Sequence, residues 1–248
     1  MQFFEHNFIG HSYDKIQNWS GSDSITLLTE NLVKMPENWY YRTHPVTYEF
    51  NSFGHRSKEL ADIYLENYIL FTGCSHTEGV GLELSKTYSN IVSTNLSSDN
   101  YNLGLGSTGI DILMHNLITW FAVVPHLPRA LVIQWPEESR FVTSTTNSTY
   151  LMPKGAWHTE SEVERFFLAG EDTRFFQTRK ILANKLIETI VKCPVIHVNV
   201  SDKIPFNEEA IQMQQLDSAR DGMHLGIKSN AKFAIQISKE ILRKEQKQ

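Results

Sequence analysis

The sequence of 248 residues predicts an α/β domain over residues 62–248, preceded by an N-terminal extension over residues 1–61. Short apolar runs of strand length recur along the domain and alternate with segments whose apolar residues follow a helical period. Strands that alternate with helices form parallel sheets covered on both faces. In addition, the apolar run at 68–71 ends at a glycine and small polar residues, which is typical of the strand exits where such sheets carry their chemistry.

The composition excludes several classes of protein. With 41% hydrophobic and 21% charged residues, the chain falls within the range of ordinary globular proteins. The net charge is −5 and the basic residues are scattered, so we expect no nucleic-acid partner, because phosphate binding requires a concentrated basic face. No run of about 18 uncharged apolar residues predicts a membrane span. The first residues lack a secretory pattern and there are only two cysteines, so we expect a cytoplasmic protein, although a virion component would look the same.

The extension is rich in Asn, Ser, His and aromatic residues and shows no sustained period. We interpret it as a segment wrapped on the domain. Residues 48–56 alternate apolar and polar side chains before an Asn-Ser pair and a glycine, which predicts a short strand and a turn that dock on the body as a structural strap.

Within the domain the periodicity predicts each element in turn. We expect strands at 68–71, 100–104, 130–135 and 194–200, and helices at 88–96, 110–121, 159–168, 178–191 and 227–242. In the helix at 178–191 we expect one apolar face, made by Ile181, Leu182, Leu186, Ile187 and Ile190. The polar segment 137–159 is interpreted as a lid or insertion, and residues 201–220 as a loop.

Three segments carry residue types that can act together. They are Gly-Cys-Ser-His-Thr-Glu-Gly at 73–79, Asn-Leu-Gly-Leu-Gly-Ser-Thr-Gly at 102–109 and Asp-Gly-Met-His at 221–224. A serine nucleophile needs a base, and the base needs a group that orients it. Asp221 and His224 are three residues apart, so we expect both side chains on one side of a helical turn, with His224 facing Ser75.

These three segments, in this order, resemble the SGNH hydrolase superfamily, also called GDSL esterases and lipases. Residues 51–56, Asn-Ser-Phe-Gly-His-Arg, resemble a leader found in one branch of that superfamily, so the resemblance covers about 48–242. It implies a three-layer α/β/α, flavodoxin-like fold. It also implies ester hydrolysis through an acyl-enzyme, often of acetyl groups on carbohydrate.

Carried over residue by residue, the resemblance makes Ser75 the nucleophile, His224 the base and Asp221 its orienting carboxylate. It places the oxyanion hole at the backbone amides of Ser75 and Ser107, with Gly106 beside Ser107 as the alternative. Negative charge that develops in a transition state must be met by such preorganised donors.

The sequence departs from the family pattern at two places. Cys74 replaces the aspartate that usually precedes the nucleophile. After the third strand, relatives carry a Gly-x-Asn-Asp turn whose asparagine side chain is an oxyanion donor, and here residues 134–140 read Gln-Trp-Pro-Glu-Glu-Ser-Arg. That donor is therefore missing, or is supplied by Gln134, Arg140 or another group.

Several side chains keep two interpretations. His76 lines the substrate pocket or lies on the surface, and Trp135 stacks against a sugar or packs in the core. The segment 104–109 also matches the dinucleotide pattern G-x-G-x-x-G, but the acidic residue expected about 20 positions later is not found at the end of the next strand. Glu137 and Glu138 resemble paired glycosidase carboxylates or a solvated turn. No histidine has zinc-ligand spacing, so we expect no metal and no cofactor.

The sequence therefore predicts a serine esterase that acts on a small ester, such as an O-acetyl group on a carbohydrate. The missing third-segment asparagine leaves open a non-catalytic glycan-binding or structural module, for example of a virion. An acyltransferase that uses the same triad is also open.

Overall fold

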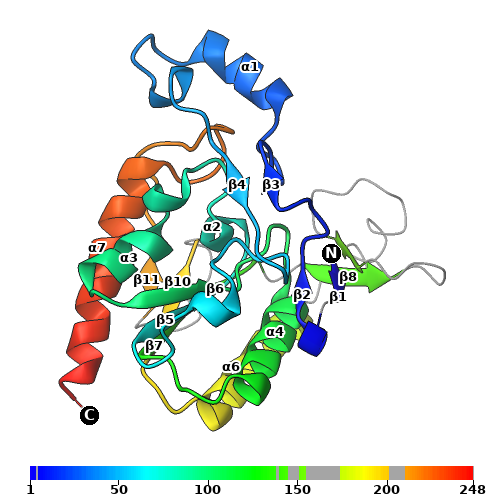
Figure 1. Ribbon diagram of the computed structural model, residues 1–248, viewed down its shortest axis with the longest axis vertical. Helices are drawn as coiled ribbons and strands as arrows, with labels where there is room; N and C mark the ends of the chain where they lie inside the picture. The colour runs from blue at the N-terminus through cyan, green and yellow to red at the C-terminus, as the bar shows by residue number, and fades with distance from the viewer. Residues whose placement is uncertain (4, 138–139, 145–150, 155–173, 201–209, 248) are drawn as a thin grey trace.

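The computed structural model describes residues 1–3, 5–137, 140–144, 151–154, 174–200 and 210–247 (Figure 1). Its centre is a five-stranded sheet in which every pairing is parallel. The strands are β5 (Tyr68–Thr72), β6 (Asp99–Asn102), β7 (Ala130–Trp135), β10 (Val195–Asn199) and β11 (Ile211–Gln212). All four predicted strands are confirmed. The fifth, β11, lies where the sequence predicted a loop, because two residues are too few to show a period.

The strand order is β6-β5-β7-β10-β11, with the first strand of the body second from one edge. Numbered along the body, this is the order 2-1-3-4-5 of flavodoxin-like folds. In such sheets the connections leave in opposite directions from the first and third strands. Ligand sites form outside the carboxyl ends of these two strands. Here the first and third strands are β5 and β7.

Helices cover both faces of the sheet and give the predicted three layers (Figure 1). Side chains of β5 alternate between the two cores: Leu70 belongs to one apolar cluster and Phe71 to the other. The first cluster includes side chains of α4 (Ile110–Val123) and α6 (Arg174–Ile190), and the second includes side chains of α3 (Tyr88–Asn95) and α7 (Ile227–Glu245). The predicted helices at these four places are confirmed.

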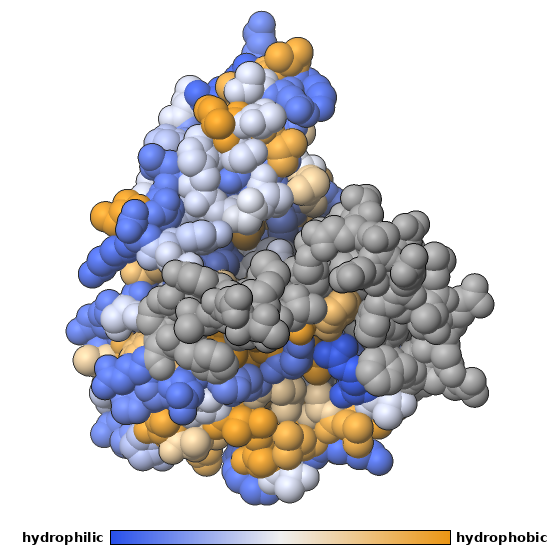
Figure 2. Space-filling model, turned by 90° about the vertical axis from the view of Figure 1, so that its right-hand side faces the viewer, coloured by the Kyte–Doolittle hydropathy of each residue, from blue (hydrophilic) through white to orange (hydrophobic). Residues whose placement is uncertain are grey.

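The buried face of α6 differs from the prediction. Ala183 and Ile187 are buried together with Val191, which follows the helix, whereas Leu182 and Leu186 are 60% and 40% exposed. The two leucines precede the buried residues by one position and therefore lie about 100° around the helix. The helix has more apolar residues than one face can bury. Figure 2, which views the molecule from the right-hand side of Figure 1, shows apolar residues gathered on the lower part of that face.

The extension contains more regular structure than its sequence indicates. It forms β1 (Gln2–Phe3), β2 (Ile9–Gly10), β3 (Ile16–Gln17), α1 (Ile25–Lys34) and β4 (Tyr48–Glu49). The predicted strand at 48 is confirmed as β4, which pairs antiparallel with β3. The helix α1 was not predicted, although Ile25, Leu28 and Leu32 have helical spacing. Its one buried side chain is Asn31. In Figure 1, α1 lies at the end of the molecule away from the sheet.

Buried polar contacts attach the extension to the body. The side chain of Asn116 in α4 accepts from Ile9 N–H at 2.8 Å and donates to Ile9 C=O at 2.7 Å. The His55 ring contacts Ile9 C=O and the Tyr101 hydroxyl, both at 3.0 Å. Burial lowers the pKa of His55 to about 4, so this ring is neutral near pH 7. The Arg56 guanidinium is buried and donates to Gly79 C=O at 2.7 Å.

The polar segment 137–159 is described only in part. Its strands β8 (Phe141–Ser144) and β9 (Leu151–Lys154) pair antiparallel, so this segment includes a β-ribbon where a lid or insertion was predicted. The predicted helix at 159–168 lies outside the described residues. Among the described helices, none has the length and apolar character needed to cross a bilayer.

Candidate active site

Ser75 stands at the carboxyl end of β5, next to β7, as the strand-exit pattern predicted. Gly73 and Cys74 connect β5 to the short helix α2 (Ser75–Glu78). A Cβ atom on Gly73 would lie 2.2 Å from Thr77 Oγ1 and 2.8 Å from Gln134 Cβ. Only glycine fits at this point, and its absence of a side chain lets the turn close tightly under Ser75.

Gln134, from β7, braces this turn. Its Oε1 accepts from Cys74 N–H at 2.9 Å and from the Thr77 hydroxyl at 3.2 Å, while its Nε2 donates to Trp135 C=O at 2.6 Å. The side chain is fully buried. The sequence offers Gln134 as one of several possible substitute oxyanion donors. The structure places it beneath the turn, with its carboxamide bonded to protein groups, because the turn needs an acceptor for its own donors.

Asp221, His224 and Ser75 form a continuous hydrogen-bonded chain. His224 Nε2 lies 2.7 Å from Ser75 Oγ, and His224 Nδ1 lies 2.6 Å from Asp221 Oδ2. An ionised carboxylate can only accept, so Nδ1 carries the proton and Nε2 is left to accept from the serine hydroxyl. The three predicted triad residues are thus brought together across 149 positions of sequence.

The segment that carries Asp221 and His224 is a turn and not the helical turn we predicted. Gly222 has φ +77°, a left-handed value that favours glycine. The second carboxylate oxygen of Asp221 accepts from Met223 N–H and His224 N–H, both at 3.0 Å. One side chain therefore fixes both the backbone of the turn and the imidazole ring, which is why the three-residue spacing was still informative.

A fourth side chain, the hydroxyl of Ser22, contacts Asp221 from the extension. Ser22 Oγ donates to Asp221 Oδ2 at 2.7 Å and lies 3.4 Å from His224 Nδ1. Burial alone would raise the pKa of the Asp221 carboxyl. Hydrogen bonds and charge from His224, with the Ser22 hydroxyl, outweigh burial and hold that pKa well below its usual range. Asp221 is therefore ionised at neutral pH, as an orienting carboxylate must be. Sequence reasoning missed Ser22, which no motif marks.

His76 lies beside His224. The ring centroids of His76 and His224 are 4.7 Å apart. Burial, with the charges of His224 and Arg140, lowers the pKa of His76 to about 3, so the ring is neutral. Its Nδ1 is shielded from solvent and makes no hydrogen bond to any described residue. His76 therefore lies next to His224, and its role in lining the substrate pocket stays a prediction.

Two backbone amides near Ser75 are available to an oxyanion. In the part of the chain that the structure describes, neither Ser75 N–H nor Ser107 N–H donates a hydrogen bond. Gly106 N–H, the alternative donor, is bonded to the Glu78 carboxylate. A Cβ atom on Gly106 would lie 4.0 Å from Ser75 Cβ, so this turn passes close to the nucleophile. The geometry therefore favours Ser107 over Gly106.

Glu78 is the second residue that sequence reasoning missed. It is fully buried, and its carboxylate accepts from Ser20 Oγ at 2.7 Å and lies 3.0 Å from His11 Nε2. Burial would raise the pKa of Glu78. The charge and hydrogen bond of His11, with those from Ser20 and Gly106, reverse this effect and lower the pKa to about 2. The signal in the sequence was only an acidic residue three positions after the serine.

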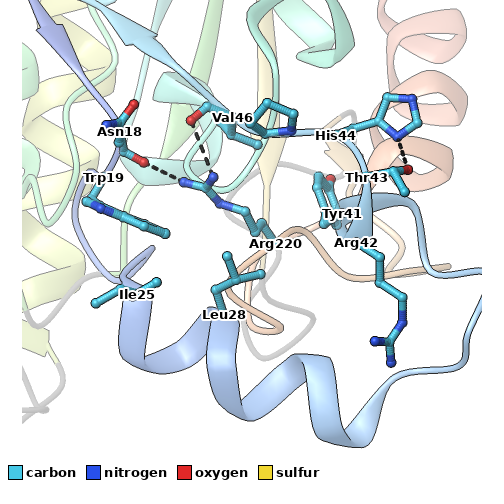
Figure 3. A pocket seen from close by; sticks show the side chains of 11 residues that line it. Asn18, Trp19, Ile25, Leu28, Tyr41, Arg42, Thr43, His44, Val46 and Arg220 are labelled. Atoms are coloured by element: carbon cyan, nitrogen blue, oxygen red, sulfur yellow. Dashed lines mark hydrogen bonds between the residues drawn. The ribbon is translucent and has the colours of Figure 1, made fainter.

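Arg220, next to Asp221, is held by the extension. Its guanidinium lies 4.3 Å from the Trp19 ring centroid and donates to Asp23 Oδ2 at 2.7 Å. Figure 3 shows Arg220 between Trp19 and Val46, with its bonds to the Asn18 and Val46 carbonyls, in the wall of a hollow of about 360 Å³. The residue before Asp221 is therefore fixed by side chains more than 170 positions away.

Trp135 is a core residue. It is 3% exposed, belongs to the cluster beneath α4 and α6, and its Nε1 donates to His197 Nδ1 at 3.1 Å. The sugar-stacking prediction for Trp135 is therefore wrong, because its position on β7 turns the ring into the sheet's apolar layer. The core alternative is the one the structure supports.

The structure also describes Asn102, Glu137 and the side chains that could bind a metal ion. Asn102 is buried, donates to Thr77 C=O at 2.7 Å and accepts from Gly104 N–H at 2.9 Å, so it ties the second segment to the nucleophile turn. Glu137 lies 3.7 Å from Arg140, and Glu138 is outside the described residues. Among the described side chains, no group of three or more His, Cys, Asp or Glu is arranged to hold a metal ion.

Comparison with solved structures finds proteins with a similar fold, whereas comparison of sequences finds none. No family model matches the sequence, and no curated protein matches it. An acetyl xylan esterase from Butyrivibrio proteoclasticus aligns with a TM-score of 0.48 at 13% identity, over 72% of this chain and 64% of that chain. A family two carbohydrate esterase from Clostridium thermocellum, in complex with cellohexaose, gives the same four values.

A third structure, a member of the lipolytic G-D-S-L family from Veillonella parvula, aligns with a TM-score of 0.35 at 14% identity, over 72% of this chain and 74% of that chain. This chain thus spans about 64% of the length of the two carbohydrate esterases. Likeness at 13–14% identity concerns the fold alone.

Proposed function

We propose that the protein is a serine ester hydrolase of the SGNH type. The observation that carries this proposal is the hydrogen-bonded chain from Asp221 through His224 to Ser75, with distances of 2.6 and 2.7 Å. A hydroxyl within hydrogen-bond reach of a base that is itself oriented by a third group is the arrangement that makes serine a nucleophile. The second requirement is an oxyanion hole, and the backbone amides of Ser75 and Ser107 are available for it.

In the first half of the reaction, Ser75 Oγ attacks the ester carbonyl carbon while its proton passes to His224 Nε2. Asp221 stabilises the imidazolium through Nδ1–H. The carbonyl oxygen becomes an oxyanion that the amides of Ser75 and Ser107 meet, and one such donor contributes about 2.7–4 kcal/mol in serine hydrolases. The bond to the alkoxide then breaks, His224 returns the proton to it, and the alcohol leaves.

In the second half, water resolves the acyl group on Ser75. His224 Nε2 takes a proton from the water as its oxygen attacks the acyl carbon, and a second oxyanion forms in the same place. The bond to Ser75 Oγ breaks, His224 returns the proton to Ser75, and the carboxylic acid leaves. The same triad serves both halves, so no further acid or base is needed.

For the substrate class, we propose small esters and in particular O-acetyl groups on carbohydrate. The resemblance of the three sequence segments to SGNH hydrolases supports this class. The Ser75 and His224 side chains are half-buried and lie beside the neutral ring of His76, which is consistent with a small acyl group.

The test is turnover of p-nitrophenyl acetate and of acetylated xylan by the parent and by Ser75→Ala. Ser52→Ala is the matched control, because Ser52 is an exposed serine that bonds Glu59 and lies outside the site. We expect Ser75→Ala to lose at least about 10³-fold in kcat and the control to lose none. Equal turnover by Ser75→Ala and the parent would refute the proposal.

A further inference from the structure

We propose that Glu78 is a positioning residue, which fixes the turn at residues 105–108 so that Ser107 N–H faces the oxyanion formed at Ser75. The inference rests on the proposed function. Because the third-segment asparagine is missing, the proposed oxyanion hole depends on the backbone amides of Ser75 and Ser107.

The turn has an unfavourable residue at its critical place. Thr108 N–H donates to Leu105 C=O at 3.3 Å and closes a four-residue turn. Ser107, the third residue, has φ +62°, whereas Gly106 is not among the positive-φ glycines. This is the pattern of a type II turn, in which the third place normally requires glycine. A serine there costs free energy, and such a conformation persists only where the surroundings enforce it.

Two consecutive amides of the turn, those of Leu105 and Gly106, donate to residues that lie on either side of Ser75 in the sequence. Leu105 N–H donates to Gly73 C=O at 3.1 Å, and Gly106 N–H donates to the Glu78 carboxylate. A hydrogen bond to an ionised acceptor is stronger than a neutral one. The bond from Gly106 fixes the Leu105–Gly106 peptide unit, and the next peptide unit of the chain carries Ser107 N–H.

Glu78 and the nucleophile share one rigid element. Ser75 and Glu78 are the first and last residues of α2, so a shift of one moves the other. No described hydrogen bond joins Glu78 to Ser75 or to His224, so the carboxylate acts through the turn and does not transfer the proton. The shared helix and the bond from Glu78 to the turn together set the distance between Ser75 Oγ and the Ser107 amide.

The extension makes this arrangement possible. A buried carboxylate is unfavourable unless it is paired and hydrogen-bonded. His11 and Ser20, both from the extension, supply two bonds to the Glu78 carboxylate, and the Gly106 amide supplies a third. A side chain that served packing alone would not need to be ionised. Glu78 is a fully buried carboxylate that three donors contact.

Glu78→Gln tests the inference. The amide keeps the shape but has one acceptor oxygen, so it cannot satisfy all three donors. We expect kcat to fall about 10- to 100-fold with KM within about twofold, because the affected interaction is made in the transition state. The fraction of protein labelled at Ser75 by a fluorophosphonate should stay complete. Glu83→Gln is the matched control, since Glu83 bonds Tyr40 away from the triad.

A second change separates positioning from folding. Ser107→Gly in the Glu78→Gln background removes the cost of the positive φ, so we expect it to restore kcat about threefold or more. If Glu78→Gln does not fold by circular dichroism, Ser20→Ala takes its place, with an expected kcat loss of about threefold at constant KM.

The inference is overturned if the folded variant turns over ester as fast as the parent, or if its loss of kcat equals its loss of labelled protein. If the parent labels at Ser75 and hydrolyses ester, and Glu78→Gln turns over ester with the same kinetics, the inference alone is refuted. A parent that neither labels nor hydrolyses ester refutes the proposed function, and the inference with it.

Discussion

The residues that would carry out the chemistry and the residues that hold them come from different regions. Ser75, Asp221 and His224 lie on turns of the sheet-built body, whereas Ser20 and Ser22 reach the same site from the extension. The body sets where the reaction takes place because parallel strands end at one edge. The extension sets how firmly the reacting groups are held. The two contributions can therefore be separated by substitution.

The largest effect is expected in the body. Asp221→Asn should lower kcat about 10⁴-fold with little change in KM, because the amide favours the wrong histidine tautomer and cannot stabilise the imidazolium. The comparison of kcat with KM for p-nitrophenyl acetate measures this. A loss of less than tenfold would mean that Asp221 does not orient His224 in the reaction.

The junction between the two regions should show the largest effect on stability. Arg220 and Asp23 form a buried ion pair at 2.7 Å, with side chains 4% and 0% exposed. Arg220→Met leaves the Asp23 charge buried without its partner and should lower the free energy of unfolding by about 3–5 kcal/mol. Urea unfolding measures it. The double variant with Asp23→Asn should be less destabilised than the single one, and an additive result would contradict this account.

Acid should weaken the attachment of the extension. The fold lowers the pKa of His55 to about 4 from 6.5, because burial disfavours the charged ring. As pH falls below about 6.5 the unfolded chain binds this proton first, so the contribution to stability is present above that pH and is lost toward about 4.

At pH 5 we therefore expect a loss of up to about 2 kcal/mol from His55 relative to pH 7.5, seen as a lower urea midpoint. His55→Asn should reduce this pH dependence. It should not abolish it, because the pKa of His76 is lowered in the same direction. A variant with the full pH dependence of the parent would show that His55 does not carry the effect.

The smallest expected effect is that of the extension on catalysis. Ser22→Ala removes one hydrogen bond to the Asp221 carboxylate and should lower kcat about tenfold, with Ser52→Ala as the control. Steady-state kinetics at saturating ester would measure it. Kinetics identical to those of the control would show that the extension supports the fold and not the triad.

Much of the body could be predicted because its signals are local, although the strand β11 and the buried face of α6 could not. The apolar run before Ser75 and the three-residue spacing of Asp221 and His224 each report a strand exit or a turn. The places of Glu78 and Ser22 could not be predicted, since their partners lie 58 and 199 positions away and no period connects them. The sequence offers Gln134 as one possible oxyanion donor and leaves Trp135 between sugar stacking and the core. The alternation of side chains along β7 decides which face each residue meets, and no signal fixes that face at a strand end.

The most direct test of the central claim is the mass of the protein after treatment with a fluorophosphonate, followed by peptide mapping. The account predicts one adduct, on Ser75, that is absent in Ser75→Ala and formed much more slowly in His224→Ala. No adduct on the folded parent, or an adduct that persists in Ser75→Ala, would contradict it.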